Sequence, residues 1–124
     1  MWPSLNELYV YNNEAILNIG SINGFPAIEH LGVMDCYALQ GVKNLFNLNG
    51  EPIPNIDSIL NTTINVGSIP KKIYFLKGCT NLRDISGLFK NTDISRLPDK
   101  FAEECVLMNI DSLLEGCGNI TSIN

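Results

Sequence analysis

The side chains of this 124-residue chain best suited to chemistry are four cysteines and one histidine. Such groups form zinc sites, disulfide scaffolds or nucleophilic pairs when their spacing allows it. The cysteines are separated by 43, 26 and 12 residues, which fits neither a zinc module nor a small disulfide framework. We therefore expect reduced, buried, structural cysteines, with no metal and no cofactor.

A cysteine nucleophile would need a basic partner. The single histidine, His30, lies six residues before Cys36. The alternation of apolar and polar residues around them predicts a strand on which His30 points outward and Cys36 inward. The two side chains would then lie on opposite faces. We expect no catalytic residues, and hence a protein that is not an enzyme.

Composition and charge exclude further classes. The chain has 45% hydrophobic residues and 17% charged residues, which is typical of a globular domain. Thirteen acidic against eight basic residues give a net charge of −5, which disfavours nucleic acid and anionic lipid as partners. No apolar run is long enough to cross a membrane. The first residues lack the pattern of a signal peptide, so we expect a cytoplasmic location for the chain as given.

The chain contains internal repeats. Residues 5–22 align with residues 28–45 at a constant offset of 23, and residues 79–89 align with 36–46 at an offset of 43. Residues 91–98 align with 117–124 at an offset of 26. In each unit a stretch with period two is followed by apolar residues three apart, which predicts a short strand and then a tight turn. A unit of this kind buries its apolar edge only against a neighbouring unit.

One position of the repeat holds a small Asn or Cys side chain where the chain must turn. A buried amide can satisfy backbone groups there, and a thiol fits the same space. We expect these residues to stack in one structural ladder: Asn13, Cys36, Asn61, Cys79 and Cys117.

The segments Leu5-x-x-Leu8-x-Val10-x-x-Asn13 and Ile28-x-x-Leu31-x-Val33-x-x-Cys36 resemble leucine-rich repeats. The segments 76–85, 97–105 and 114–123 resemble the BspA-like form of that family, found in bacterial and some protist surface proteins and in phage proteins. The resemblance implies a right-handed solenoid with a parallel β-sheet on its concave face and short 3₁₀, α or irregular connectors on its convex face. It also implies protein binding, and a place on a cell surface or virion.

The repeats divide the chain into one domain of about five rungs, at 3–25, 26–48, an irregular 49–70, 71–98 and 99–124. The apolar positions that we expect in the core are Leu5, Leu8, Val10, Ile16, Ile19, Leu31, Val33, Leu39, Val42, Leu76, Leu82, Ile85, Ile94, Leu97, Ile110, Leu114, Ile120 and Ile123.

Outward positions of the predicted strands would form an apolar concave surface with a charged rim, which is typical of an interface. The expected binding residues are Glu7, Tyr9, Tyr11, His30, Met34, Ile73, Phe75, Lys77, Leu113 and Glu115. The leading hypothesis is a protein-binding module of a bacterial or phage surface or virion protein. Two alternatives stay open. One is a small acidic intracellular inhibitor of phage type that covers a basic surface of a host protein. The other is a structural fragment that self-associates through its uncapped ends.

Overall fold

The computed structural model describes residues 4–20, 27–42, 45–48, 51–107 and 109–121. Its elements are β1 (Glu7–Asn13), β2 (His30–Cys36), β3 (Asn47–Leu48), β4 (Glu51–Pro52), α1 (Ile56–Leu60), β5 (Thr62–Val66) and β6 (Ile69–Ile73). They form three two-stranded sheets: β1 and β2 are parallel, while β3–β4 and β5–β6 are antiparallel. Within the described residues no helix is long and apolar enough to span a membrane.

The 23-residue register between the first two repeats is confirmed. β1 and β2 pair in parallel with Leu8 opposite Leu31 and Val10 opposite Val33. Asn13 lies opposite Cys36, at the end where both strands turn. The match follows from the period of two, since a slip of one residue would turn every apolar side chain away from the core.

The predicted leucine-rich-repeat solenoid is wrong. In the described residues the parallel sheet has two strands, and the other strands form small antiparallel pairs. The segment expected to supply the next parallel strand has Leu76 at φ 63° and Gly78 at φ 76°. Left-handed residues of this kind interrupt extended backbone, as Asn12 and Asp35 do near the ends of β1 and β2, and here the chain turns without forming a strand.

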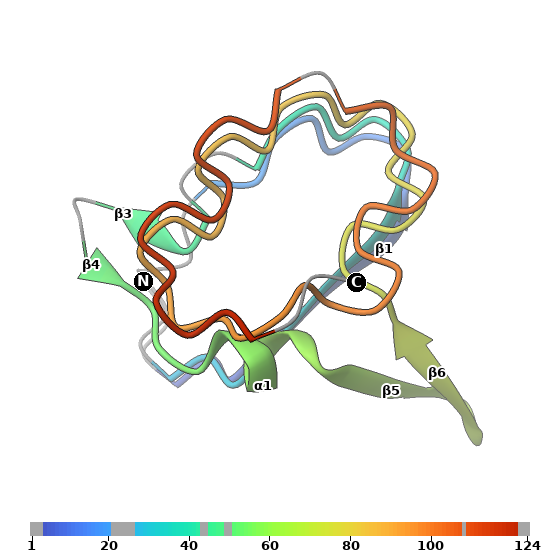
Figure 1. Cartoon of the computed structure of the whole chain (residues 1–124). Helices are drawn as coiled ribbons and strands as arrows, with labels where there is room; N and C mark the ends of the chain where they lie inside the picture. The colour runs from blue at the N-terminus through green and yellow to red at the C-terminus, as the bar shows by residue number, and fades with distance from the viewer. Residues whose placement is uncertain (1–3, 21–26, 43–44, 49–50, 108, 122–124) are drawn as a thin grey trace.

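The antiparallel hairpin β5–β6 occupies part of the stretch expected to be an irregular rung. Val66 pairs with Ile69 across a two-residue turn of Gly67 and Ser68, and Gly67 has φ 67°. A turn residue with positive φ suits the twist of two antiparallel strands, and glycine takes that conformation at low cost. Figure 1 shows β5 and β6 projecting away from the rest of the chain.

The short helix α1 is hydrogen-bonded at its start to the carboxylate of Asp93, which lies in a loop distant in sequence. Asp93 accepts hydrogen bonds from the backbone N–H groups of Asn55 and Ile56, at 2.7 and 3.0 Å. These are donors at the first turn of the helix, which have no partner inside it. Asp57 in that turn accepts further bonds from Ser95. The helix therefore sits beside the 93–95 loop.

Beyond β6 the chain has no further strand in its described residues and is built of turns (Figure 1). Its segments still lie beside earlier ones, because isolated parallel bridges join Asn18 to Gly41, Gly41 to Asp84 and Asp84 to Asn109. A backbone hydrogen bond of 2.6 Å from Leu76 to Val33 likewise places the 74–77 segment next to β2.

Four phenylalanines dominate the centre of the core. Phe46 stacks on Phe89 with ring centroids 5.7 Å apart, and Phe75 stacks on Phe101 at 6.1 Å. Phe89 also meets Phe101 at 5.5 Å in a tilted arrangement. Rings at these separations add attraction beyond the area that they bury. The cluster joins the segment before the hairpin to three turns after it.

The expected core is confirmed for its central members and not for its outer ones. Eight expected residues are buried: Leu31, Val33, Leu39, Val42, Leu76, Leu82, Ile85 and Ile94. Eight are half-buried: Leu5, Leu8, Val10, Ile16, Ile19, Leu97, Leu114 and Ile120. Ile110 is 56% exposed, which contradicts its expected burial, and Ile123 lies outside the described residues. The half-buried and exposed positions concentrate toward the first and last segments of the chain.

Candidate functional site

The first half of the expected binding surface lies on β1 and β2. Glu7 is opposite His30, and Tyr11 is opposite Met34. Between these pairs Tyr9 faces Gly32, where a Cβ atom would lie 2.8 Å from Cγ2 of Ile73 and 3.0 Å from the Tyr9 ring. Ile73 therefore covers the middle of the face that was expected to be open, and Met34 is buried.

Three of the expected contact residues, Met34, Ile73 and Phe75, are buried, so their predicted exposure is wrong. Ile73 is 2% exposed and Phe75 is 1% exposed. Phe75 packs between the rings of Phe46 and Phe101. The physical reason is the turn at Leu76: it breaks the strand alternation on which the outward assignment of Phe75 depended.

The remaining expected residues stand on later segments of the chain. Lys77 forms an ion pair with Glu104 at 2.9 Å, and Glu115 forms one with Lys90 at 3.0 Å. Both pairs reach solvent, where such contacts contribute little to stability. Leu113 is half-buried. The structure thus brings together five of the ten expected binding residues: Glu7, Tyr9, Tyr11, His30 and Met34. The ten residues do not form one exposed surface.

Burial raises the pKa of the Tyr9 phenol to about 12, and its hydrogen bond with Glu7 acts in the same direction. The hydroxyl donates to the Glu7 carboxylate at 2.6 Å. A phenolate beside that carboxylate would meet a like charge, so the neutral phenol is favoured. This hydrogen bond holds the Tyr9 ring in place beside Gly32.

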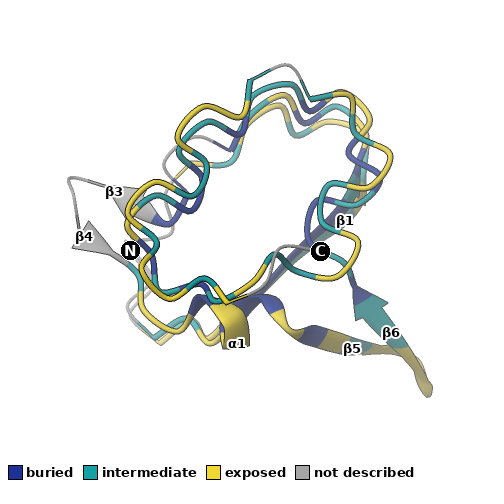
Figure 2. Ribbon diagram, viewed as in Figure 1, coloured by how far each residue is buried: buried dark blue, intermediate teal, exposed yellow. Residues whose placement is uncertain are grey.

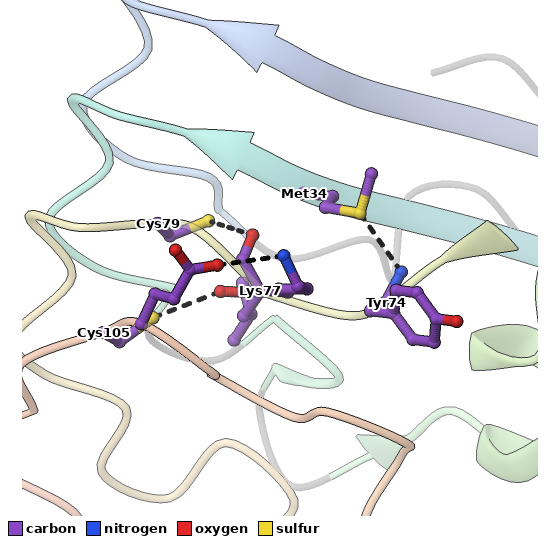
Figure 3. Close-up of polar contacts among 7 residues, drawn as sticks. Met34, Tyr74, Lys77, Cys79 and Cys105 are labelled. Carbon is purple, nitrogen blue, oxygen red and sulfur yellow. Dashed lines mark hydrogen bonds and ion pairs between the residues drawn. The ribbon is translucent and has the colours of Figure 1, made fainter. Parts of the chain in front are cut away.

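All four cysteines are free thiols, and three of them form a column across successive segments. Cys36 donates to the carbonyl of Val10 at 3.4 Å, and Cys105 donates to that of Leu76 at 3.1 Å. Cys79 lies between them, and its Sγ contacts the Lys77 carbonyl (Figure 3). Hydrogen bonding to Cys36 raises the pKa of the Cys79 thiol, and burial adds to it. The same hydrogen bond lowers the pKa of the Cys36 thiol, and the column satisfies backbone carbonyls.

The structure places three of the five expected ladder residues in one column. Asn13, Cys36 and Cys79 follow one another, but Cys105 takes the next place. Cys117 instead donates to the Phe89 carbonyl at 2.9 Å. Asn61 is exposed at the end of α1 and accepts a hydrogen bond from Lys72. Asn61 departs because it ends α1, and Cys105 follows Cys79 by 26 residues, the offset of the last repeats.

The structure also separates His30 from Cys36. They stand at the two ends of β2, a distance of about 20 Å along an extended strand. His30 Nδ1 is buried without a hydrogen-bond partner. In the described part of the chain, no group of three or more His, Cys, Asp or Glu side chains could hold a metal ion.

Sequence reasoning missed an open pocket of about 510 Å³ at the base of the hairpin. The buried residues Ile73, Phe75 and Ile94 lie behind its wall, and Lys72 and Arg96 contribute charge. The Ser95 hydroxyl donates to the Asp57 carboxylate at 2.6 Å on one wall. This hydrogen bond joins α1 to the 94–99 loop.

The hairpin itself has one apolar and one polar face. Directly opposed residues of an antiparallel pair share a face, so Ile64, Val66, Ile69 and Lys71 lie together. We call these four residues the hairpin face. Val66 is 47% exposed and Ile69 is 69% exposed, and Figure 2 shows the outer half of the hairpin in contact with solvent.

A signal for this hairpin is present in the sequence. Gly67-Ser68 stands between two runs rich in β-branched residues, Thr62–Val66 and Ile69–Ile73. That pattern is a recognised indicator of a two-residue hairpin. The constant offset of the repeats competes with this signal, because it predicts a further rung over the same residues.

No family model, no curated protein and no solved structure matches the chain. The resemblance to BspA-like repeats therefore stays a prediction from sequence. The functional evidence is the geometry of the hairpin face and of the pocket beside it.

Proposed function

We propose that the chain is a non-enzymatic protein-binding module that engages its partner through the hairpin face. The observation that carries the proposal is the exposed Val66–Ile69 pair at the tip of the projecting hairpin. A two-stranded hairpin alone is marginally stable in water, and its outer half gains little from the core below it. Covering this apolar face would stabilise both the hairpin and the complex.

Charge indicates the chemistry of the partner. Residues 62–73 contain two lysines and no acidic residue, although the whole chain has a net charge of −5. Lys71 stands on the hairpin face, opposite Ile64. The partner that fits is a protein with a shallow apolar recess and a carboxylate at its rim. Such complementarity contributes chiefly to specificity and association rate.

The test compares variants that keep the strands intact. Replacing Val66 and Ile69 together by Thr preserves β-branching while removing the apolar surface. We expect this double variant to weaken binding of a partner captured by the wild-type chain and then purified, by at least tenfold in calorimetric titration. Val106→Thr is the matched control, because Val106 is 64% exposed and lies outside the hairpin. Unchanged binding by the double variant would overturn the proposal.

A charge reversal separates this function from the acidic-inhibitor alternative. We expect Lys71→Glu to weaken binding, since it removes the cation from the hairpin face. If the overall negative charge instead drove attachment to a basic surface, the same substitution would strengthen binding. Lys72→Glu is the matched control, since Lys72 lies on the opposite face of the hairpin.

A further inference from the structure

Four segments of the described chain form an ordered series. Asn18, Gly41, Asp84 and Asn109 follow one another through parallel bridges. Gly41 and Asp84 have a bridge partner on both sides. In the described part of the chain, Asn18 and Asn109 have one on a single side only.

Burial at the next position differs between the inner and the outer members of this series. The residues that follow the four bridge positions are Ile19, Val42, Ile85 and Ile110. The two inner members, Val42 and Ile85, are 0% and 1% exposed. Ile110 is 56% exposed and Ile19 is half-buried. All four are aliphatic side chains, so the difference comes from their neighbours and not from their chemistry.

Backbone hydrogen bonds define how a further segment would attach. Asn109 donates to the Arg83 carbonyl at 3.0 Å, and Ile85 donates to the Asn109 carbonyl at 3.0 Å. Arg83 and Ile85, which flank the bridge residue Asp84, thus both hydrogen-bond to Asn109, the next bridge residue of the series. If the same pattern continued beyond Asn109, the Ile110 N–H would donate to the carbonyl of the next bridge residue, and Asn18 of a second copy could take that place.

We propose that the last segment of one copy docks on the first segment of a second copy, head to tail, and sets Ile110 against Ile19. The second copy is the occupant that fits, because its first segment has the strand direction, the bridge residue and the aliphatic side chain that the series requires. Further half-buried apolar residues of the two segments would also be covered: Leu8, Val10 and Ile16 on one, and Leu107, Leu113 and Leu114 on the other.

Negative charges on both segments oppose this contact, and the resulting salt dependence gives a test of it. Glu7 and Glu14 are exposed on the first segment, and Asp111 and Glu115 are exposed on the last. Like charges on the two surfaces repel, and salt screens that repulsion. We therefore expect association to strengthen as salt rises from about 0.05 to 0.5 M, because the Debye length falls from about 14 to about 4 Å over that range. Electrostatic binding to the hairpin face would respond in the opposite direction.

The experiment is sedimentation velocity of the full chain over a range of concentrations, with one blocked end at a time. Ile110→Glu blocks the last segment and Ile19→Glu blocks the first. Each variant alone should be monomeric, with association weakened at least tenfold. Mixed together, each still has one intact end, so the pair should form a dimer that does not grow. Ile69→Glu is the matched control, because its side chain is 69% exposed on the hairpin.

The outcomes separate the possibilities. A wild-type chain that remains monomeric at all concentrations and salt levels would overturn the proposal, as would an Ile110→Glu variant that associates as the wild type does. A contact that pairs identical ends would leave one of the two variants dimeric by itself, which also contradicts it. Thermal melts check that both variants are folded; should Ile19→Glu unfold, the comparison of Ile110→Glu with Ile69→Glu decides alone.

Discussion

Gly78 offers a substitution whose cost can be worked out in two parts. Its φ of 76° lies in the left-handed region, where an L-residue costs about 1–2 kcal/mol. A Cβ added there would also fall far inside van der Waals contact with Oδ1 of Asp35. Relieving that overlap should cost a further amount of about 1–3 kcal/mol, as overpacking does. Gly78→Ala is therefore expected to destabilise the fold by about 2–5 kcal/mol.

Gly87 is the matched control. It has a φ of 66°, but nothing lies within 4 Å of the position that an alanine Cβ would take there. Gly87→Ala should therefore show the backbone cost alone, about 1–2 kcal/mol. For a chain of this length 1 kcal/mol lowers the melting temperature by about 4 °C. Thermal unfolding followed by circular dichroism should then separate the two variants by roughly 4–12 °C.

The second half of the test is a double-mutant cycle. Asp35→Gly removes the obstructing carboxylate and suits the φ of 53° at that position. In this background Gly78→Ala should cost no more than Gly87→Ala does, which gives a coupling energy of about 1–3 kcal/mol. Equal melting temperatures for Gly78→Ala and Gly87→Ala in the wild-type background would refute the close packing of the 35 and 78 turns.

Three further predictions concern the core, a helix cap and a titration. Leu82→Ala should cost about 2–5 kcal/mol in chemical denaturation, because Leu82 is fully buried; an unchanged midpoint would contradict its place in the core. Asp93→Ala should cost about 0.5–2 kcal/mol, because it removes the acceptor at the start of α1; an Asp93→Asn variant should recover part of this. The Tyr9 phenol should ionise near pH 12 in a difference absorbance titration against Tyr9→Phe, and Glu7→Gln should lower that pKa. Because the folded pKa lies above the usual 10.0, this contribution to stability is present below pH 10 and is lost as the pH rises toward 12.

Ile73 and Phe75, two of the three expected binding residues that are buried, show where sequence reasoning failed. Ile73 and Phe75 follow an apolar alternation that fits either face of a strand equally well. The alternation holds only while the backbone stays extended, and Leu76 leaves that conformation. Leucine rarely adopts a left-handed φ, so no residue type at this position announces the turn.

The hairpin shows a different kind of failure, in which a longer pattern outweighs a local signal. Gly67 and Ser68 indicate a turn on their own. A repeat with an offset of 23 implies that each stretch has an equivalent neighbour, and the expected rung at 49–70 rests on that implication. The structure forms α1 and the hairpin there instead, and Asn61, at the end of α1, lies outside its expected column.

The sequence by itself determined the pairing of β1 with β2 and the burial of Leu31 and Val33, because side-chain alternation is a property of neighbouring residues and fixes one register. Only the tertiary structure decided that the parallel sheet stops there, that four phenylalanines meet, and that Val66 and Ile69 remain uncovered. These outcomes depend on left-handed turns and on contacts between distant segments. Their free energy comes from packing across the whole chain, which no local pattern of residue types contains.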